Sequence, residues 1–438
     1  MHNVIYWLKV ALINVAVLFV LLELTAFSIY RIQYGANFYQ HPPQVELLPE
    51  VVQGRVALKK YLHPYFGYLN YPPGARFGNR KYNNFGFHSA GVDYPYVKSA
   101  PNEYVIGIFG GSVAQQIFVK SRADIIRGLK ADERFKDKEI VVLTFAQGGY
   151  KQPQQLQLLT YFLSIGQQFD TVINLDGFNE IVLSEKNSRQ GLSITMPSAG
   201  HMLEMMDILN QSELSSEKIE ALADISRLKR KINRMAESAN QSKLACSWLW
   251  ATTLRKRAYR TLNESIVAYQ SIPSRPSEDS VVYLNPSLEP LTRDQALEKA
   301  ADYWRDASIL MHKVATANNI KYVHILQPNQ YFGNRVFGPE ESNVAIDHSH
   351  NYSANAIEGY PRLAARIDDF EQHGVHFASG LGIMDSEPGM VYADACCHFN
   401  STGTKLIAEF IVKQVLDAHR YPFKSHAVNL VEQVVDAD

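Results

Sequence analysis

Residues 104–114 read YVIGIFGGSVA, in which an apolar run is followed by two glycines and a serine. Short apolar runs rich in β-branched and aromatic residues are typical of strands buried on both faces of a parallel sheet. Four similar runs follow, and helical stretches separate them. This alternation predicts an α/β fold, a flavodoxin-like three-layer sandwich with a five-stranded parallel sheet. The four further strands are expected at 139–145 (EIVVLTF), 171–175 (TVINL), 322–326 (YVHIL) and 375–378 (VHFA).

Polar and glycine-rich residues follow these strands, at the edge where ligands bind in open α/β sheets. Ser112 stands at the start of a helix, Gly149 and Asn179 follow the second and third strands, and Asp394 and His398 precede a late helix. A hydroxyl, an imidazole, a carboxylate and amide donors at one edge are what nucleophilic acyl chemistry requires. Taken singly, each has a simpler interpretation, because Ser112 and Asn179 could be helix caps and His398 a packed histidine.

In order and spacing, these residues resemble the SGNH hydrolases, also called the GDSL esterase family. The stretches NNFGFHS and ILQPNQYF also look like membrane-anchored bacterial members of this group. The resemblance covers residues 101–190 and 292–418. Its four blocks are IFGGSVA with Ser112, FAQGGY with Gly149, LDGFNEI with Asn179, and DACCHFNSTG with Asp394 and His398.

The resemblance implies a serine esterase mechanism. Ser112 would attack an ester carbonyl, His398 would act as general base, and Asp394 would orient the imidazole. The backbone N–H groups of Ser112 and Gly149, with the side-chain amide of Asn179, would form the oxyanion hole. Neither a cofactor nor a metal is expected to take part.

Three positions depart from the family pattern. Gly111 and Glu180 each stand where the family has Asp, and neither lies in the expected reaction path. Asp394 precedes His398 by four residues, one more than is usual. The longer loop could turn Asp394 away from the ring, in which case Asp385 or a backbone carbonyl would orient His398.

The composition excludes several classes of protein. The 438 residues include 43 Lys and Arg against 44 Asp and Glu, a formal charge of -1 that argues against a general nucleic-acid binder. Cys246, Cys396 and Cys397 are too few for a disulfide framework. In an exported domain one of the vicinal pair could bridge to Cys246, or all three could pack as reduced small hydrophobes. The pair His348 and His350 is a weak metal motif, and we expect a polar loop there.

Residues 10–29 read VALINVAVLFVLLELTAFSI, a stretch that reaches about 30 Å as a helix. We expect a single uncleaved transmembrane anchor within residues 1–31; a long signal peptide and a buried core helix are the alternatives. Glu23 is costly in lipid. Lys9 and Arg31 flank the apolar stretch on opposite sides, so the positive-inside rule does not decide its orientation. We expect the main domain to be exported because most of the chain follows the anchor.

The rest of the chain divides around the core blocks. Residues 32–100 are rich in Tyr, Pro, Gly and Asn, which predicts an N-terminal wrapping segment of turns and short strands. The core occupies 101–190 and 292–420, its second part opening with a helix that Thr292 and Gln295 cap as a capping box. A tail follows at 421–438.

A helical insertion is expected at 191–291, because this stretch is too long for a plain crossover. Apolar residues recur at helical spacing over 219–235, a second helix is expected at 243–269, and 272–290 would form the return loop. Basic residues on both helices could form a lid, dock a protein partner or bind anionic glycans or lipid headgroups. A solvated charged face is an equal alternative.

The leading functional hypothesis is a membrane-anchored serine esterase that removes an O-acyl or O-acetyl group from a carbohydrate or other envelope ester. The same Ser–His pair could instead transfer the acyl group to a polysaccharide hydroxyl. A third hypothesis is a catalytically inert binding or assembly module.

Overall fold

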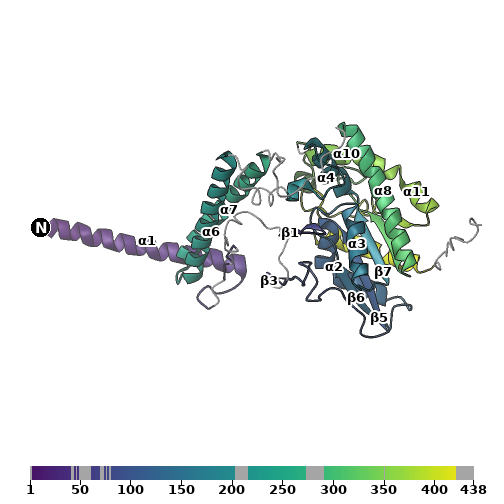
Figure 1. Cartoon of the computed structure of the whole chain (residues 1–438). Coiled ribbons are helices and arrows are strands. Elements are labelled where there is room, and N and C mark those ends of the chain that lie inside the picture. Colours follow the sequence, from purple (N-terminus) through teal and green to yellow (C-terminus); the bar gives the residue numbers. More distant parts are fainter. Residues whose placement is uncertain are drawn as a thin grey trace, which may run out of the picture. The chain divides into compact units, whose positions relative to one another are not determined.

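Five parallel strands form the central sheet of the computed structural model (Figure 1). Their order is β6-β5-β7-β8-β9, so the chain starts inside the sheet, steps to one edge and then crosses to the other. This is the 2-1-3-4-5 order of flavodoxin-like folds, and the predicted α/β fold is confirmed. The strands are β5 (Glu103–Gly110), β6 (Glu139–Thr144), β7 (Thr171–Asp176), β8 (Lys321–Leu326) and β9 (His376–Ser379), close to the five apolar runs.

The structure describes residues 2–40, 44–45, 47–48, 61–69, 74, 76–77, 80–202, 216–272, 291–349 and 351–420. The expected return loop from residue 273 to 290, His350 and the tail at 421–438 lie outside these residues. The chain divides into two compact units. Unit 1 comprises Met1–Leu58 and Met206–Val281, and unit 2 comprises Lys59–Met205 and Val282–Asp438.

Helices form two layers around the sheet of unit 2, as right-handed crossovers require. In one layer α2 (Ser112–Lys130) packs against α12 (Ser401–Ala418). In the other, α8 (Arg293–Ala317) contacts α3, α4 and α10. The predicted capping box begins α8, since Thr292 and Gln295 each accept a hydrogen bond from the other's backbone N–H. The other helices of unit 2 whose bounds are described are α3 (Gln154–Ser164), α4 (Phe178–Arg189), α9 (Pro339–Ala345), α10 (Asn351–Ala364) and α11 (Ile367–Gln372).

Aromatic side chains attach the described residues between 61 and 100 to the sheet. Tyr94 stacks on Phe145 with ring centroids 4.6 Å apart, and its hydroxyl donates to the Thr144 carbonyl. Phe66 and Phe162 stack in the same aromatic core. The same segment contains two small antiparallel pairs, β1 (Tyr61–His63) with β2 (Gly67–Leu69) and β3 (Arg76–Phe77) with β4 (Arg80–Lys81).

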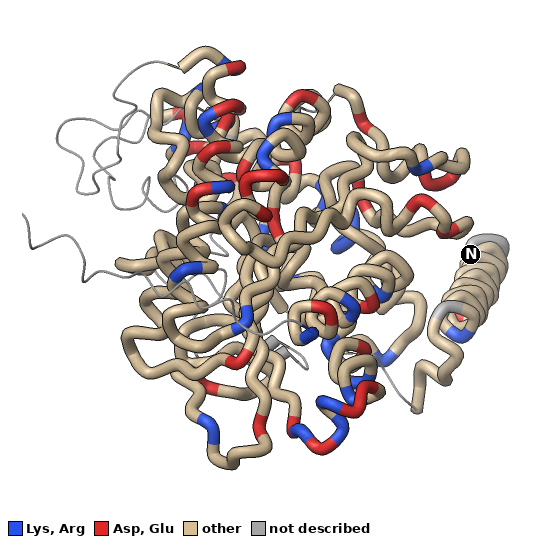
Figure 2. The backbone as a smooth tube through the Cα atoms, turned by 90° about the vertical axis from the view of Figure 1, so that its right-hand side faces the viewer, with Lys and Arg blue, Asp and Glu red and all other residues tan. Residues whose placement is uncertain are grey.

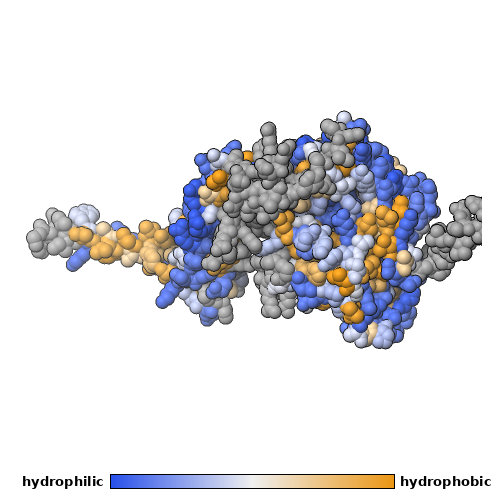
Figure 3. All heavy atoms as spheres, viewed as in Figure 1, coloured by the Kyte–Doolittle hydropathy of each residue, from blue (hydrophilic) through white to orange (hydrophobic). Residues whose placement is uncertain are grey.

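Unit 1 consists of α1 (His2–Tyr34), α6 (Ser216–Gln241) and α7 (Ala245–Ser271). The two predicted insertion helices are confirmed as α6 and α7, which pack against each other. Within α1, Tyr6–Ile32 is long and apolar enough to cross a membrane by length and composition, as a signal sequence would also be. The helix carries few charges (Figure 2) and a nearly continuous apolar surface (Figure 3).

One carboxylate interrupts the apolar helix α1. Glu23 accepts hydrogen bonds from the N–H groups of Ala245 and Cys246, at 2.6 and 3.0 Å, and from the Tyr39 hydroxyl. Glu23 therefore caps the N-terminus of α7, where helix N–H groups have no partner within the helix.

Candidate active site

Ser112 is the first residue of α2 and follows the end of β5 by two residues. The turn is tight, because Gly110 has φ +140° and a Cβ there would lie 2.1 Å from the Leu175 carbonyl of β7. Only glycine fits this position. The half-buried Ser112 therefore lies at the sheet's topological switch point, at the positive end of the α2 dipole.

His398 meets Ser112 from 286 residues further along the chain. Its Nε2 atom lies 2.8 Å from Ser112 Oγ, and its Nδ1 atom lies 2.6 Å from Asp394 Oδ2. The structure thus brings the three expected catalytic residues into one hydrogen-bonded chain. Asp394, rather than the exposed Asp385, is the carboxylate at Nδ1.

Asp394 reaches the ring because its loop curls around the carboxylate. Its Oδ1 atom accepts hydrogen bonds from the N–H groups of Cys396, Cys397 and His398, at 2.9, 3.1 and 3.2 Å. The additional residue between Asp394 and His398 is accommodated in this turn. The other oxygen, Oδ2, remains directed at the imidazole.

The two ionisable partners shift each other's pKa values. Burial alone would lower the pKa of His398, but the hydrogen bond and charge of Asp394 raise it above its ordinary value. Burial would raise the pKa of Asp394, whereas the hydrogen bond and charge of His398 lower it to about 2. Asp394 is therefore a carboxylate at neutral pH, and His398 is a strengthened base.

A buried ion pair holds the loop that carries Asp394 and His398. Glu341 of α9 accepts hydrogen bonds from the N–H groups of Val391 and Tyr392, at 2.7 and 3.1 Å. Arg335 pairs with Glu341, with side chains 6% and 3% exposed, and donates to backbone carbonyls of residues 384, 387 and 389. No local sequence pattern marks this role, because the backbone groups that the pair holds lie about 50 residues further along the chain.

The two further oxyanion candidates line the same turn region. Asn179, at the start of α4, donates from Nδ2 to the Tyr150 carbonyl at 2.9 Å. A Cβ on Gly111 would lie 2.2 Å from this Nδ2, so the Asn179 amide lies directly against the Ser112 turn. Gly149 has φ +83° and is buried beneath Tyr68 and His201. Asn179 thus lies beside Ser112, and Gly149 belongs to the adjoining turn after β6.

Glu180 has a structural role beside the site. It is buried, and its carboxylate accepts hydrogen bonds from the N–H groups of Gly177 and Gln152, at 2.8 and 2.9 Å. Burial raises the pKa of Glu180 to about 8. Glu180 therefore ties the loop after β6 to the start of α4.

A second Ser–His–Asp arrangement lies wholly inside the fold. His324 Nε2 lies 2.8 Å from Asp176 Oδ1, and His324 Nδ1 lies 2.8 Å from Ser308 Oγ. The Trp304 indole also donates to Asp176, at 2.6 Å. All four side chains are buried, so no substrate reaches this Ser308. This arrangement was not predicted from the sequence, where its signal is a histidine inside an apolar strand.

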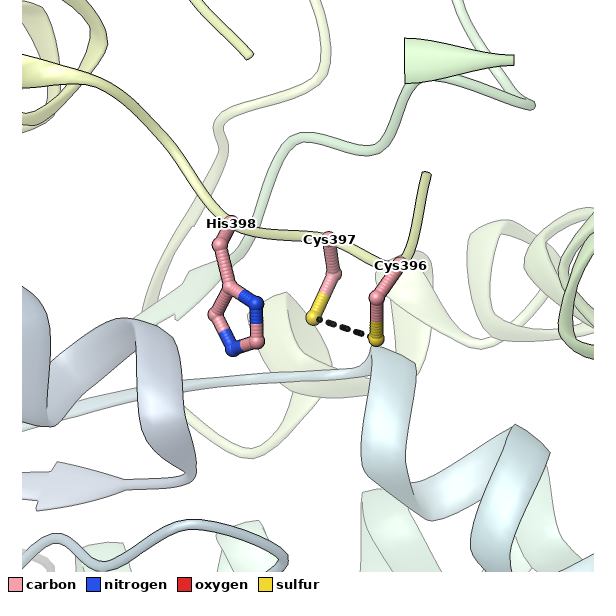
Figure 4. A group of neighbouring side chains, drawn as sticks. All are labelled: Cys396, Cys397 and His398. Carbon is pink, nitrogen blue, oxygen red and sulfur yellow. Dashed lines mark hydrogen bonds between the residues drawn. The ribbon is translucent and has the colours of Figure 1, made fainter. Parts of the chain in front are cut away.

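The three cysteines carry free thiols, and Cys246 forms no bridge. Cys396 and Cys397 lie beside the imidazole with their sulfur atoms 3.4 Å apart (Figure 4). A hydrogen bond from Cys397 lowers the pKa of Cys396 and raises that of Cys397 itself. Of the weak metal motif, His348 is exposed and His350 lies outside the described residues.

Two surface hollows, of about 480 and 520 Å³, lie on α6 and α7 of unit 1. Basic side chains, among them Arg230, Lys231 and Arg234, line the larger one. The charged face expected on the insertion is therefore present.

Comparisons with known proteins give little further information. No family model matches the chain, and no curated protein matches it. The solved structures that are similar include a Bacteroides fragilis NCTC 9343 protein provisionally named an acylhydrolase, which matches over 74% of this chain and 92% of its own. The TM-score is 0.33 and the identity 12%. At that similarity the likeness adds nothing to the site geometry.

Proposed function

We propose that this chain is a serine esterase of the SGNH type that cleaves an O-acyl ester through an acyl-Ser112 intermediate. The observation that carries the proposal is the hydrogen-bonded chain Ser112–His398–Asp394, with separations of 2.8 and 2.6 Å. The three residues of this hydrogen-bonded chain are half-buried, whereas those of the Ser308–His324–Asp176 arrangement are fully buried.

In the proposed reaction, Ser112 Oγ attacks the ester carbonyl while its proton passes to His398 Nε2. Asp394 holds the proton of Nδ1 in place and stabilises the imidazolium that forms. His398 then gives its proton to the leaving alkoxide, which departs as an alcohol. A water molecule, deprotonated by the same nitrogen, releases the acyl group as a carboxylic acid and restores the Ser112 hydroxyl.

The developing negative charge on the carbonyl oxygen needs donors. The Ser112 N–H at the first turn of α2 and the Asn179 amide against that turn support this role, and Gly149 N–H is the third proposed donor. A single donor of this kind contributes about 3 to 4 kcal/mol to transition-state stabilisation.

The proposed setting is a membrane, with α1 as a single anchor, unit 2 exported, and an O-acylated carbohydrate or other envelope ester as substrate. The apolar surface of Tyr6–Ile32 supports the anchor. The Glu23 carboxylate, costly in lipid when unpaired, has three hydrogen-bond donors.

The test uses the full chain in detergent with an aryl acetate and an acetylated glycan. We expect hydrolysis by the wild type and a loss of at least 10³-fold in Ser112→Ala and His398→Ala. Ser308→Ala is the matched control, because it removes the serine of the buried arrangement. Equal turnover in the wild type and Ser112→Ala would refute the proposal. Acylation of an added glycan acceptor would assign the same site to acyl transfer instead.

A further inference from the structure

The proposed mechanism leaves two thiols beside the base unused. Cys396 and Cys397 directly precede His398, and their sulfur atoms and an imidazole nitrogen all lie within 4.8 Å of one another. Figure 4 shows both sulfur atoms on the same side of the loop as the ring. Two thiols and an imidazole are the donor set that zinc prefers in proteins.

We propose that Cys396, Cys397 and His398 form a binding site for Zn²⁺, and that the bound ion inhibits the esterase. Binding replaces the two thiol protons, so that each site takes up one Zn²⁺ and releases two H⁺, with no change of oxidation state. A water molecule completes the tetrahedron.

The present separations of the three donor atoms are close to those of a zinc site. Two sulfur ligands at about 2.3 Å from zinc lie about 3.8 Å apart in a tetrahedral site. The observed separation of 3.4 Å must therefore open slightly. The imidazole nitrogen, at most 4.8 Å from the sulfurs, has to approach to about 3.6 Å.

A disulfide between the two thiols fits the loop less well. Its sulfurs would have to close from 3.4 Å to about 2.05 Å within a ring that contains the Cys396–Cys397 peptide. The N–H of that peptide is held by Asp394 Oδ1 at 3.1 Å. Cys397 is also only 2% exposed, which favours a small ion over a bulky oxidant.

Inhibition follows from the hydrogen bonds of the ring. His398 Nε2 faces Ser112 at 2.8 Å, and Nδ1 faces Asp394 at 2.6 Å. A metal ion on either nitrogen displaces one of these partners. The zinc-bound ring therefore either cannot take the Ser112 proton or loses its orienting carboxylate. This consequence rests on the proposed esterase function, whereas metal binding itself does not.

The binding test uses the reduced full chain in detergent and a chromogenic chelator that competes for Zn²⁺. We expect one zinc per chain for the wild type and for Cys246→Ser, the matched control on α7. Cys396→Ser and Cys397→Ser should each weaken binding at least tenfold. Co²⁺ should give a thiolate charge-transfer band that both variants reduce. Equal zinc affinity in all four proteins, or a vicinal disulfide that forms in place of zinc binding, would overturn the proposal.

Activity gives an independent readout. Zinc should inhibit hydrolysis by the wild type and Cys246→Ser, and a chelator should restore it. For each protein, inhibition is measured relative to its own zinc-free rate. The zinc concentration that halves this rate should be at least tenfold higher in Cys396→Ser than in the wild type. Zinc binding without any esterase activity would refute the proposed function and leave the site standing. Esterase activity in a protein that binds no zinc and is not inhibited by it would support the proposed function and refute the zinc site.

Discussion

Asp394 divides its two carboxylate oxygens between two tasks. Oδ2 contacts the imidazole, and Oδ1 accepts three backbone N–H groups of its own loop. An asparagine could keep its amide oxygen in the loop, but its NH₂ group would then face Nδ1 and could not accept the Nδ1 proton. The substitution therefore removes both the charge and the acceptor at Nδ1, and it separates the contact with His398 from the hydrogen bonds of the loop.

In Asp394→Asn we expect kcat to fall by about 10²- to 10⁴-fold, because the imidazolium loses its stabilising charge. The acidic limb of the pH–rate profile should also move to lower pH. The sign follows from the raised pKa of His398: the base works only above its pKa, and removing the carboxylate lowers that pKa. A profile of kcat/KM against pH checks both effects. An unchanged acidic limb would contradict the role of Asp394.

Asn179 contributes through one amide group. In Asn179→Ala we expect kcat to fall by about 10²- to 10³-fold with a smaller change in KM, because the donor acts on charge that appears in the transition state. Asn318→Ala, at the exposed end of α8, is the matched control. Steady-state kinetics on an aryl acetate measure the difference. A variant that loses only substrate affinity would place Asn179 in binding instead.

Among the elements, the loop from Val391 to Asn400 depends on α9 for its position. Glu341 binds its first two N–H groups and is neutralised by Arg335. Removing one member of a buried ion pair leaves the other charge uncompensated. The pair thus links the stability of the fold to the position of His398.

We expect Glu341→Ala to destabilise unit 2 by about 3 to 5 kcal/mol and to lower esterase activity. Denaturant unfolding of the full chain, followed by tryptophan fluorescence, measures the loss. Trp7, Trp248 and Trp250 are replaced by Phe in every protein compared, so that the buried Trp304 of unit 2 alone reports. Glu340→Ala is the matched control, because Glu340 is the residue next to Glu341 and its own side chain is exposed. Equal stability of the two variants would show that the ion pair does not hold the loop.

The elements were predictable from the sequence where the pattern is local. The five strands, the capping box at Thr292 and helices α6 and α7 follow from residue periodicity and capping chemistry, and the structure confirms them. The candidate residues Ser112, Asn179 and His398 could be named because each stands at the end of a predicted element. The buried Ser308–His324–Asp176 arrangement could not, since its members meet only through tertiary packing. Nor could the contacts of the Arg335–Glu341 pair with the backbone of residues 384–392, which lies about 50 positions further along the chain.

At the scale of the whole molecule, each unit has its own means of cohesion. Unit 2 has a parallel sheet with an aromatic core. Unit 1 relies on three helices and on polar contacts, among them Asn233 and Asn240 of α6, which pair with the backbone of Leu48 and Val45. Glu23 adds the contact between α1 and the start of α7.

In Glu23→Ala we expect the amides of Ala245 and Cys246 to exchange hydrogen at least tenfold faster in the full chain. Hydrogen bonds to a charged group contribute about 1.5 to 3 kcal/mol each, and the helix end would lose two. Ser28→Ala is the control, because this exposed hydroxyl bonds only to Leu24 of its own helix. Amide exchange read by mass spectrometry checks the result. Unchanged exchange would show that Glu23 does not cap α7.

Ser112 and His398 are 286 positions apart in the sequence, and this separation has a consequence during synthesis. A ribosome completes β5 and the start of α2 well before it translates the imidazole that would activate the hydroxyl. A nascent polypeptide that ends between these two residues therefore carries a serine without its base. Chemical competence would arise only when the segment that carries His398 docks onto the start of α2.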